Sequence, residues 1–548
     1  MIRAQKHYFR TFSKININEC KNYETNRFFV PLLLCNSLWG YGKNDRESKM
    51  NIVYIMTDDH SYQTISAYGG PLGKLAPTPN LDRLAAKGML FQRAFVENSL
   101  STPSRACLMT GLYSHQNGQR TLFGNVDTTK TFFSEILQQN GYQTAVVGKW
   151  HMRCEPKGFD YYQVLWDQGA YYHPEFKSKD TNGKYVRREG YATTLTTDYA
   201  IDFLEHRNTS MPFCLLVHHK APHRNWMPEP KYLHLYENAE FPYPDTFDDD
   251  YNTRCRPANE QEMQIDKDMT IVYDLKLNQL KDTSPYNKEW NVKGMQASIN
   301  RMNVEERGQW EAAYEKRYAD FMKKKAAGAD MKKWKYQEYL KDYLRCIKSI
   351  DDEVGRLLEY LEAHDLMENT MIVYTSDQGF YMGEHGWFDK RFMYEESFRT
   401  PLIIYYPQKK ENSKCNALVQ NIDYAPTILD AAGIEKPHYM VGNSLLPLLS
   451  GKIPAKWRRD IYYHYYDYPA QHKVRRHDGV RDSRYKLIHF YGTKKDPLDC
   501  NELYDLKKDP NELNNLYDDL KYKKVQQRLQ KRLDEYRSAL KVDEYNDK

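Results

Sequence analysis

The sequence predicts an α/β fold in which a mixed, mainly parallel sheet is flanked by helices. Short apolar runs alternate with amphipathic segments, which is the pattern of parallel strands joined by helical crossovers. Polar clusters directly follow several of the apolar runs, as expected where strands end at the carboxyl edge of an open sheet. After Leu448 the pattern changes to strands and one closing helix, which predicts a smaller C-terminal α+β subdomain.

Four apolar runs are predicted to form buried strands, at residues 51–56, 144–147, 213–217 and 371–374. The first leads into Asp58 and Asp59, and the second into a cluster that begins at Gly148. The third is followed by a histidine-rich cluster at 218–223, and the fourth by Asp377. Because strand ends of this kind hold the ligand sites of open α/β sheets, we expect the four clusters to meet.

Amphipathic segments supply the predicted helices, of which residues 81–88 form a short one. A charged insertion rich in Tyr and Trp occupies about 225–340, with poor strand signal and a helix at 305–325. Strands at 462–465 and 485–490 precede a closing helix at 521–540. A core-facing stripe with helical spacing consists of Tyr343, Ile347, Ile350, Val354, Leu357 and Leu361.

The chain of 548 residues exceeds one ordinary core, so one large domain and a smaller one are expected. The predicted parts are an N-terminal export or disordered segment at 1–49, an α/β domain at 50–447 that contains the insertion, and a C-terminal subdomain at 448–548.

Composition is that of a soluble globular protein, with 41% hydrophobic and 28% charged residues. The formal charge of +5 is small for this length and gives no case for nucleic-acid binding. The nine Cys lack CxxC pairs, so neither a zinc site nor a disulfide framework is indicated.

No apolar run reaches transmembrane length. Residues 28–35 form either a short export h-region after Arg27 or a buried strand, and we expect export. Cys35, which follows three Leu, is a candidate for lipidation.

Asp58, Asp59, Asp377 and Gln378 supply hard oxygen ligands of the kind that Ca²⁺ or Mg²⁺ prefers. Adjacent Asp side chains on a regular strand point to opposite faces, so both can bind one ion only where the strand is ending. A solvated acidic turn is the alternative for Asp58 and Asp59 alone. Four ligand candidates at two strand ends favour the metal site, and the neutral oxygen of Gln378 favours Ca²⁺ over a soft metal.

Residues 101–111, Ser-Thr-Pro-Ser-Arg-Ala-Cys-Leu-Met-Thr-Gly, resemble the signature of the type I sulfatases, in which (Cys/Ser)-x-Pro-x-Arg is closed by Thr-Gly. The resemblance implies that a maturation enzyme oxidises Ser101 to formylglycine (3-oxoalanine), whose hydrate is the nucleophile and a ligand of the metal. A hydroxyl bound to a divalent cation ionises more readily than an ordinary Ser hydroxyl. Ser101 is also expected to cap a helix that has Pro103 in its first turn.

Further strings resemble elements of the same family. Residues 148–151 resemble Gly-Lys-x-His, residues 383–390 resemble Gly-Glu-His-Gly-x-x-x-Lys, and His223 follows Ala221-Pro222 as in a late Pro-His element. The catalytic residues that the resemblance implies are Ser101, Arg105, Lys149, His151, His223 and Lys390. His218 and His219 are close enough in sequence to be alternatives to His223.

Charge counting agrees with an anionic substrate. Arg105, Lys149 and Lys390, together with a divalent cation, outweigh the three Asp ligands and leave the pocket net positive. In the implied mechanism, one hydroxyl of the hydrated formylglycine attacks sulfur, and the alcohol leaves with a proton from His223. His151 then takes the proton of the second hydroxyl, sulfate is eliminated, and the aldehyde returns.

The resemblance spans roughly 51–516 and implies an alkaline-phosphatase-like fold. Residues 219–228 look like the corresponding string of bacterial N-acetylglucosamine-6-O-sulfatases, which implies exo-acting 6-O-desulfation of glucosamine in heparan-type or mucin-type glycans, in the periplasm or at the cell surface of a bacterium. Arg475, Arg476 and His477 are expected either to bind the sugar or to form a solvated loop. The rival functions are a sulfatase for another sugar position, a formylglycine-dependent phosphonate monoester or phosphodiester hydrolase, and a non-enzymatic glycan-binding protein.

Overall fold

A ten-stranded mixed sheet forms the centre of the computed structural model, which describes residues 49–281, 288–407, 409 and 411–543. The strand order is β12-β2-β11-β9-β1-β8-β4-β5-β6-β7. The strands are β1 Asn51–Thr57, β2 Met89–Phe91, β4 Gln143–Gly148, β5 Tyr161–Leu165, β6 Glu175–Ser178, β7 Val186–Arg187, β8 Phe213–His218, β9 Thr370–Ser376, β11 Leu402–Tyr405 and β12 Ser413–Cys415.

The middle of this sheet, β9-β1-β8-β4-β5, is parallel, with Ile55 paired to Val217 on one side and to Tyr374 on the other. Antiparallel strands β11 and β6 flank it. All four predicted strands are present within one or two residues of their expected ends. The α/β prediction is therefore confirmed.

Strand β1 is buried on both faces. Val53 and Ile55 pack into one hydrophobic cluster, while Ile52, Tyr54 and Met56 pack into another on the opposite side. Side chains alternate across a strand, so a continuous apolar run is what a strand covered by helices on both sides requires.

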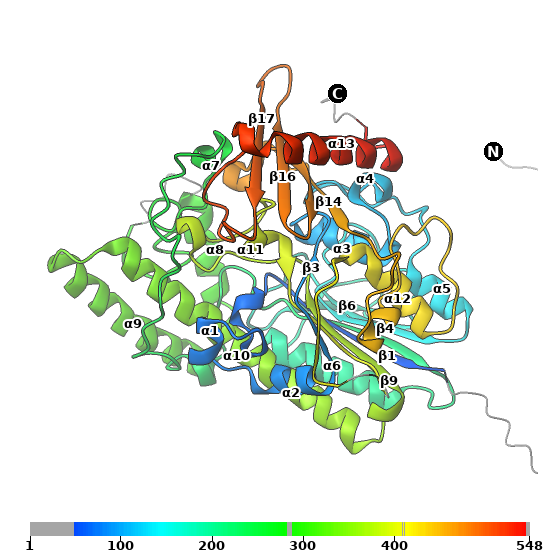
Figure 1. The fold of residues 1–548 in the computed structure, drawn as a ribbon. Helices are drawn as coiled ribbons and strands as arrows, with labels where there is room; N and C mark the ends of the chain where they lie inside the picture. Colours follow the sequence, from blue (N-terminus) through cyan, green and yellow to red (C-terminus); the bar gives the residue numbers. More distant parts are fainter. Residues whose placement is uncertain (1–48, 282–287, 408, 410, 544–548) are drawn as a thin grey trace, which may run out of the picture. The chain divides into compact units, whose positions relative to one another are not determined.

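Helices cover the two faces of the sheet (Figure 1). One cluster contains side chains of α2 Pro79–Lys87, α6 Ala192–His206 and α10 Met331–Ala363. The other contains side chains of α3 Ser101–Thr110, α5 Phe133–Gln139 and α12 Tyr424–Ala431. The shorter helices are α1 Pro71–Leu75, α4 Ser114–Asn117, α7 Pro257–Glu260 and α11 Glu395–Phe398.

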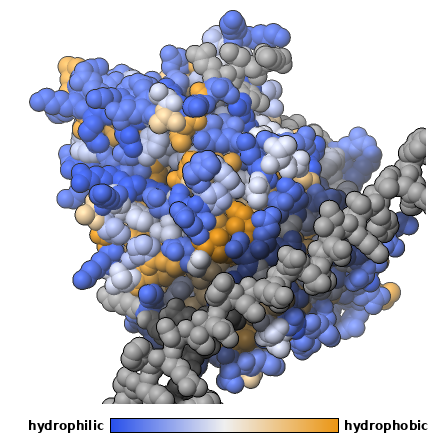
Figure 2. Space-filling view, turned by 90° about the vertical axis from the view of Figure 1, so that its right-hand side faces the viewer, coloured by the Kyte–Doolittle hydropathy of each residue, from blue (hydrophilic) through white to orange (hydrophobic). Residues whose placement is uncertain are grey.

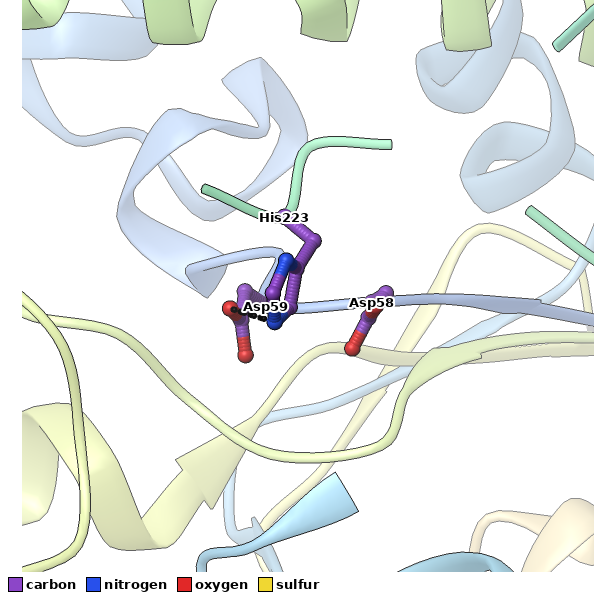
Figure 3. Close-up of side chains that lie close together, drawn as sticks. All are labelled: Asp58, Asp59 and His223. Carbon is purple, nitrogen blue, oxygen red and sulfur yellow. Dashed lines mark ion pairs between the residues drawn. The ribbon is translucent and has the colours of Figure 1, made fainter. Parts of the chain in front are cut away.

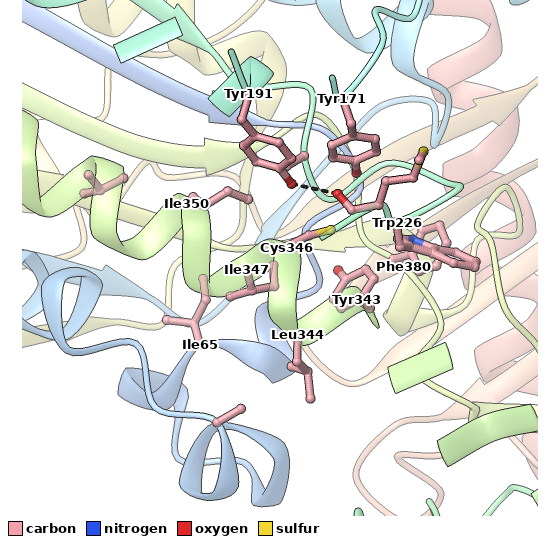
Figure 4. Close-up of a cluster of buried hydrophobic side chains, with 14 of the residues drawn as sticks. Ile65, Tyr171, Tyr191, Trp226, Tyr343, Leu344, Cys346, Ile347, Ile350 and Phe380 are labelled. Carbon is pink, nitrogen blue, oxygen red and sulfur yellow. Dashed lines mark hydrogen bonds between the residues drawn. The ribbon is translucent and has the colours of Figure 1, made fainter. Parts of the chain in front are cut away.

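The predicted core-facing stripe lies on α10, and all six of its residues are buried. Figure 4 shows Tyr343, Ile347 and Ile350 of this helix in a cluster that also holds Trp226 and Phe380.

The predicted insertion consists of turns and short helices up to residue 281 and of longer helices from Lys288 onward. Its described part contains α8 Lys288–Ile299 and α9 Val304–Ala326 but no strand. Asn303 begins α9 with a capping box, in which its side chain accepts from the amide of Glu306. Helix α10 begins inside the insertion and continues past residue 340.

A four-stranded antiparallel sheet forms the C-terminal part, with strands β14 Asp460–Tyr465, β15 His477–Asp482, β16 Tyr485–Tyr491 and β17 Asp499–Asp505. Helix α13 Lys523–Leu540 packs Leu529 and Leu533 against it (Figure 1). A third, small sheet consists of β3 Ala94–Phe95, β10 Arg399–Thr400 and β13 Val419–Gln420. The smaller α+β part is thus confirmed, while its boundary at 447/448 stays a prediction.

Among the helices in the described ranges, none has the length and hydropathy needed to cross a bilayer. The face in Figure 2 is mostly hydrophilic, with a limited hydrophobic area near its middle. The predicted export segment at 28–35, including Cys35, lies outside the described residues.

Candidate active site

The polar clusters lie at the carboxyl ends of four neighbouring parallel strands. Asp58 follows β1, Lys149 follows β4, and Asp377 follows β9. His223 lies in the segment after β8. Since these strands are adjacent in the order β9-β1-β8-β4, their ends share one edge of the sheet.

Asp58 and Asp59 both point into this site because β1 ends at Thr57, directly before them. Asp59 has a φ of 68°, which places it in the left-handed region and breaks the alternation of strand side chains. Neither residue is exposed. Oxygens of both carboxylates and a ring nitrogen of His223 lie within 4.8 Å of one another (Figure 3).

Asp377 and Gln378 face the same carboxylates. Asp377 Oδ1 accepts a hydrogen bond from the amide of Asp59 at 3.1 Å. Gln378 Nε2 donates to Asp59 and lies 3.3 Å from Ser101 Oγ. The other amide atom, Gln378 Oε1, is buried without a hydrogen-bond partner in the part of the chain that is described.

This donor set fits a hard divalent cation. Buried polar atoms are normally hydrogen-bonded, so an unpartnered carbonyl oxygen at this position is available to bind a ligand. Here it stands beside three buried carboxylates, which are the oxygen donors that Ca²⁺ and Mg²⁺ prefer.

Ser101 lies at the first residue of α3, all ten residues of which are buried. Its Oγ donates to Asp58 Oδ1 at 3.0 Å. The N-cap position is occupied by Leu100, and no side chain caps the helix. The expectation that Ser101 caps α3 is therefore wrong, because its hydroxyl is turned toward the carboxylates, although Pro103 does lie in the first turn.

Arg105 lies one helical turn after Ser101 and is 1% exposed. Its guanidinium donates to Asp377 Oδ2 at 3.0 and 3.1 Å and to the carbonyl oxygen of Lys149 at 2.7 Å. Arg105 thus ties α3 to the ends of β9 and β4, and it positions its neighbours.

Two buried lysines contact the same acidic pair. Lys149 Nζ contacts Asp58 and the side chain of Gln168, and Lys390 Nζ lies 2.6 Å from Asp59 Oδ2. Gly148 has a φ of 90°, and a Cβ there would lie 2.0 Å from the carbonyl oxygen of His218, so only glycine allows the turn that presents Lys149.

The two histidines lie at the only partly exposed positions of the predicted catalytic set. His223 Nε2 is 3.8 Å from Asp59 Oδ2, and its Nδ1 is 2.6 Å from the carbonyl oxygen of Arg224. His151 Nδ1 is 3.4 Å from Thr102 Oγ1. Burial holds the pKa of each histidine well below its usual value, so both rings are neutral at pH 7.

Tyr343 of helix α10 holds the turn that follows β1 and carries Asp59. The hydroxyl of Tyr343 donates to the carbonyl oxygen of Asp59 at 2.6 Å and accepts from the amide of Ser61 at 2.9 Å. These two hydrogen bonds fix the backbone of residues 59–61 and so hold the Asp59 carboxylate in position.

The family profile described as Sulfatase matches residues 50–434. The chain belongs to the sulfatase family. A second profile, described as N-sulphoglucosamine sulphohydrolase, C-terminal, matches residues 383–539 of this sulfatase. Membership makes the protein a sulfuric ester hydrolase, in agreement with the resemblance of its signature string.

Curated relatives share most of the length of the sulfatase. It is 46% identical over 480 residues to the N-acetylglucosamine-6-O-sulfatase of Bacteroides thetaiotaomicron, a match that covers 84% of each chain. It is 27% identical to the human N-acetylglucosamine-6-sulfatase, over 79% of this chain and 69% of the relative.

Solved structures show the same fold. The structure of BT4656 in complex with its substrate D-glucosamine-2-N,6-O-disulfate matches with a TM-score of 0.85 and 45% identity, over 91% of this chain and 99% of that chain. The phosphonate monoester hydrolase of Agrobacterium radiobacter matches with a TM-score of 0.62 at 19% identity, over 90% of this chain and 96% of that chain, which supports the fold alone.

The three residues expected to bind sugar do not join this site. His477 is 0% exposed, and its ring accepts from the amide of Met393 and contacts the carbonyl oxygen of Arg475. The prediction that His477 contacts the sugar is therefore wrong, because both of its ring nitrogens are engaged inside the protein. Arg475 pairs with Glu260 at 2.8 Å, and Arg476 donates to two backbone carbonyls, so neither is a solvated loop residue.

His472, five residues before His477, reaches the site instead. Its ring nitrogen Nε2 lies 3.3 Å from Asp389 Oδ2 and 3.4 Å from the guanidinium of Arg224. Asp389 and Arg224 adjoin Lys390 and His223 in sequence. A φ of 68° at His472 turns its side chain inward, and sequence periodicity carries no signal for such a turn.

Lys220 is a further cation that sequence reasoning left without a role. It is 4% exposed, and its Nζ lies 4.7 Å from the ring centre of Tyr171. Burial and then Lys149 lower the pKa of Lys220 to about 8. The signal in the sequence that could have identified Lys220 is its position within the histidine-rich cluster at 218–223.

Proposed function

We propose that the protein removes the 6-O-sulfate from a glucosamine residue, N-acetylated or N-sulfated, at the non-reducing end of a heparan-type or mucin-type glycan. The observation that carries the proposal is the 46% identity over 84% of both chains to an N-acetylglucosamine-6-O-sulfatase. The substrate in the similar solved complex, D-glucosamine-2-N,6-O-disulfate, has the same 6-O-sulfate.

Residue 101 acts after oxidation by a maturation enzyme. Once oxidised to formylglycine and hydrated, it supplies a gem-diol nucleophile, and a bound Ca²⁺ supplies Lewis-acid activation of that group. The residues that would hold the cation are Asp58, Asp59, Asp377, Gln378 and residue 101. The unpartnered Gln378 Oε1 supports this assignment.

Lys149 and Lys390 stabilise the charge of the sulfate ester. Both ammonium groups are buried against the acidic pair, so they are already in place before substrate arrives. Fixed donors in a site without water stabilise developing negative charge without reorganisation. Arg105 holds Asp377 and the backbone of Lys149 in position.

His223 donates the proton to the leaving sugar oxygen. The contact of its Nδ1 with the carbonyl oxygen of Arg224 keeps a hydrogen on that nitrogen and directs Nε2 into the site. An anionic ester beside Nε2 raises the depressed pKa of the ring and lets it carry the proton. His151 accepts the proton of the second hydroxyl at residue 101.

The sugar binds at the His223 side of the site. His472, Asp389 and Arg224 form a buried polar group there, and Arg224 is itself held by Asp274 at 2.6 Å. Groups of this kind discriminate epimers strongly, because a wrong hydroxyl leaves a buried polar atom unpaired.

We place the enzyme in the periplasm or at the cell surface, where such glycans are met.

A screen of monosaccharides sulfated at single positions tests the proposal. N-acetylglucosamine 6-sulfate or N-sulfoglucosamine 6-sulfate should be desulfated fastest, and galactose 6-sulfate should be poor. Faster release from a galactose or uronic-acid sulfate would contradict the glucosamine assignment and leave the sulfatase assignment intact. Preference for phosphonate monoesters would instead favour the phosphohydrolase alternative.

A further inference from the structure

A cavity of about 830 Å³ lies between the α/β part and the C-terminal sheet. Its walls come from the segment after β1, from β10 and its neighbours, and from the turn between β15 and β16. Within the described residues, its lining includes none of the residues proposed to hold the metal or to act at Ser101.

Cationic side chains outnumber acidic side chains among the residues that line this cavity. The lining cations are Arg93, Arg399, Arg481, Arg484 and Lys507, and the lining acids are Asp245, Glu384, Glu395 and Glu396. Burial raises the pKa of Glu384, and it raises the pKa of Glu396 well above its usual value. Five lining cations therefore face four acids, and the raised pKa values of Glu384 and Glu396 weaken the negative side of this balance.

Three of the five cations lack a carboxylate partner among the described residues, namely Arg93, Arg399 and the exposed Lys507. Arg481 pairs with Glu395 at 3.0 Å, and Arg484 pairs with Asp505 at 2.7 Å. By contrast, Arg93 and Arg399 make no ion pair within 4.0 Å in the described ranges. Arg399 Nε is buried and has no hydrogen-bond partner among the described residues, and the guanidinium lies 3.8 Å from the ring centre of Tyr62.

These two arginines lie beside the same short sheet and line the same cavity. Arg399 of β10 pairs with Phe95 of β3, and Arg93 lies two residues before Phe95 on the same chain segment. Arg93 lies in the bend directly before Ala94, the first residue of β3. Two guanidinium groups without carboxylate partners in one cavity repel each other, and an anion bound between them offsets this repulsion.

We propose that this cavity is a second anion site, in which Arg93 and Arg399 bind a tetrahedral oxyanion such as a sulfate or phosphate group. Planar guanidinium groups match the oxygens of such anions with paired, charge-assisted hydrogen bonds. The ligand is either a sulfate group on a glycan chain or the free anion. The site stands apart from the catalytic centre, so it does not depend on which sulfate ester the enzyme hydrolyses.

Calorimetric titration of the full chain with inorganic sulfate, at constant ionic strength, tests the site. Arg93→Gln and the double variant Arg93→Gln/Arg399→Gln should each weaken one sulfate site by about tenfold or more, with kcat for desulfation within about twofold of wild type. Arg83→Gln, which removes a partly exposed arginine from α2, is the matched control and should bind as wild type does. The titration is repeated in Lys390→Ala, which weakens sulfate binding at the catalytic centre and so separates the two sites.

Unchanged sulfate affinity in Arg93→Gln would overturn the proposal. This variant breaks no side-chain hydrogen bond or ion pair among the described residues, so a folding defect does not obscure the result. A heparin-derived tetrasaccharide distinguishes the two sources of the anion. Binding tighter than inorganic sulfate, lost in Arg93→Gln, identifies a glycan site, and equal affinity identifies a free-anion site.

Discussion

Replacing Lys390 with alanine should lower kcat by about 10²- to 10³-fold. The Lys390 side chain is 4% exposed, and its ammonium lies 2.6 Å from Asp59 Oδ2. A unit charge about 4 Å from developing negative charge contributes about 4 kcal/mol at an effective dielectric constant of about 20. Loss of one preorganised donor costs about 2.7–4 kcal/mol in comparable sites. Since about 1.36 kcal/mol corresponds to a tenfold change in rate, both figures give a loss of this size.

The assay is sulfate release from N-acetylglucosamine 6-sulfate, normalised to the fraction of protein that carries formylglycine. Lys87→Ala is a matched control, because the Lys87 side chain is 46% exposed and pairs only with Glu362 among the described residues. A kcat/KM within twofold of wild type in Lys390→Ala would refute the reasoning. A raised KM at unchanged kcat would show that Lys390 binds the ground state and the transition state equally.

Three further outcomes are expected. Peptide mass analysis of active protein should show the loss of two hydrogens at Ser101, and protein made without a Ser-competent maturation enzyme should be folded but nearly inactive; full activity with an intact Ser would contradict this. Chelation should abolish desulfation, and Ca²⁺ should restore it best, whereas restoration only by Mn²⁺ or Zn²⁺ would favour a phosphohydrolase. His477→Ala should lower the free energy of unfolding in urea by about 2–4 kcal/mol and leave KM unchanged, because it removes a fully buried ring with two hydrogen bonds; a raised KM at wild-type stability would argue for a sugar contact after all.

The strands and the convergence of their ends could be predicted because buried parallel strands produce continuous apolar runs. Asp58, Lys149 and Asp377 each follow such a run directly, and topology then brings them to one edge. The family signature at Ser101 added the chemistry that spacing alone does not carry.

The sugar-facing residues could not be predicted in the same way. His472 and His477 lie in one basic segment, but a left-handed residue at His472 and the start of β15 at His477 send their side chains to different places. Gln168, which contacts Lys149, lies beyond β5 with no motif around it. Such contacts depend on local backbone turns, which composition and periodicity do not encode.

The length of α10 has a consequence for protein engineering. This helix of 33 residues begins in the predicted insertion and carries Tyr343, whose hydroxyl holds the Asp59 turn. An α-helix turns by about 100° per residue, so a junction inside α10 that adds or removes one residue would rotate every upstream side chain away from its neighbours. Chimaeras that exchange this region between sulfatases should therefore be joined before Met331, so that the whole helix travels with the catalytic scaffold.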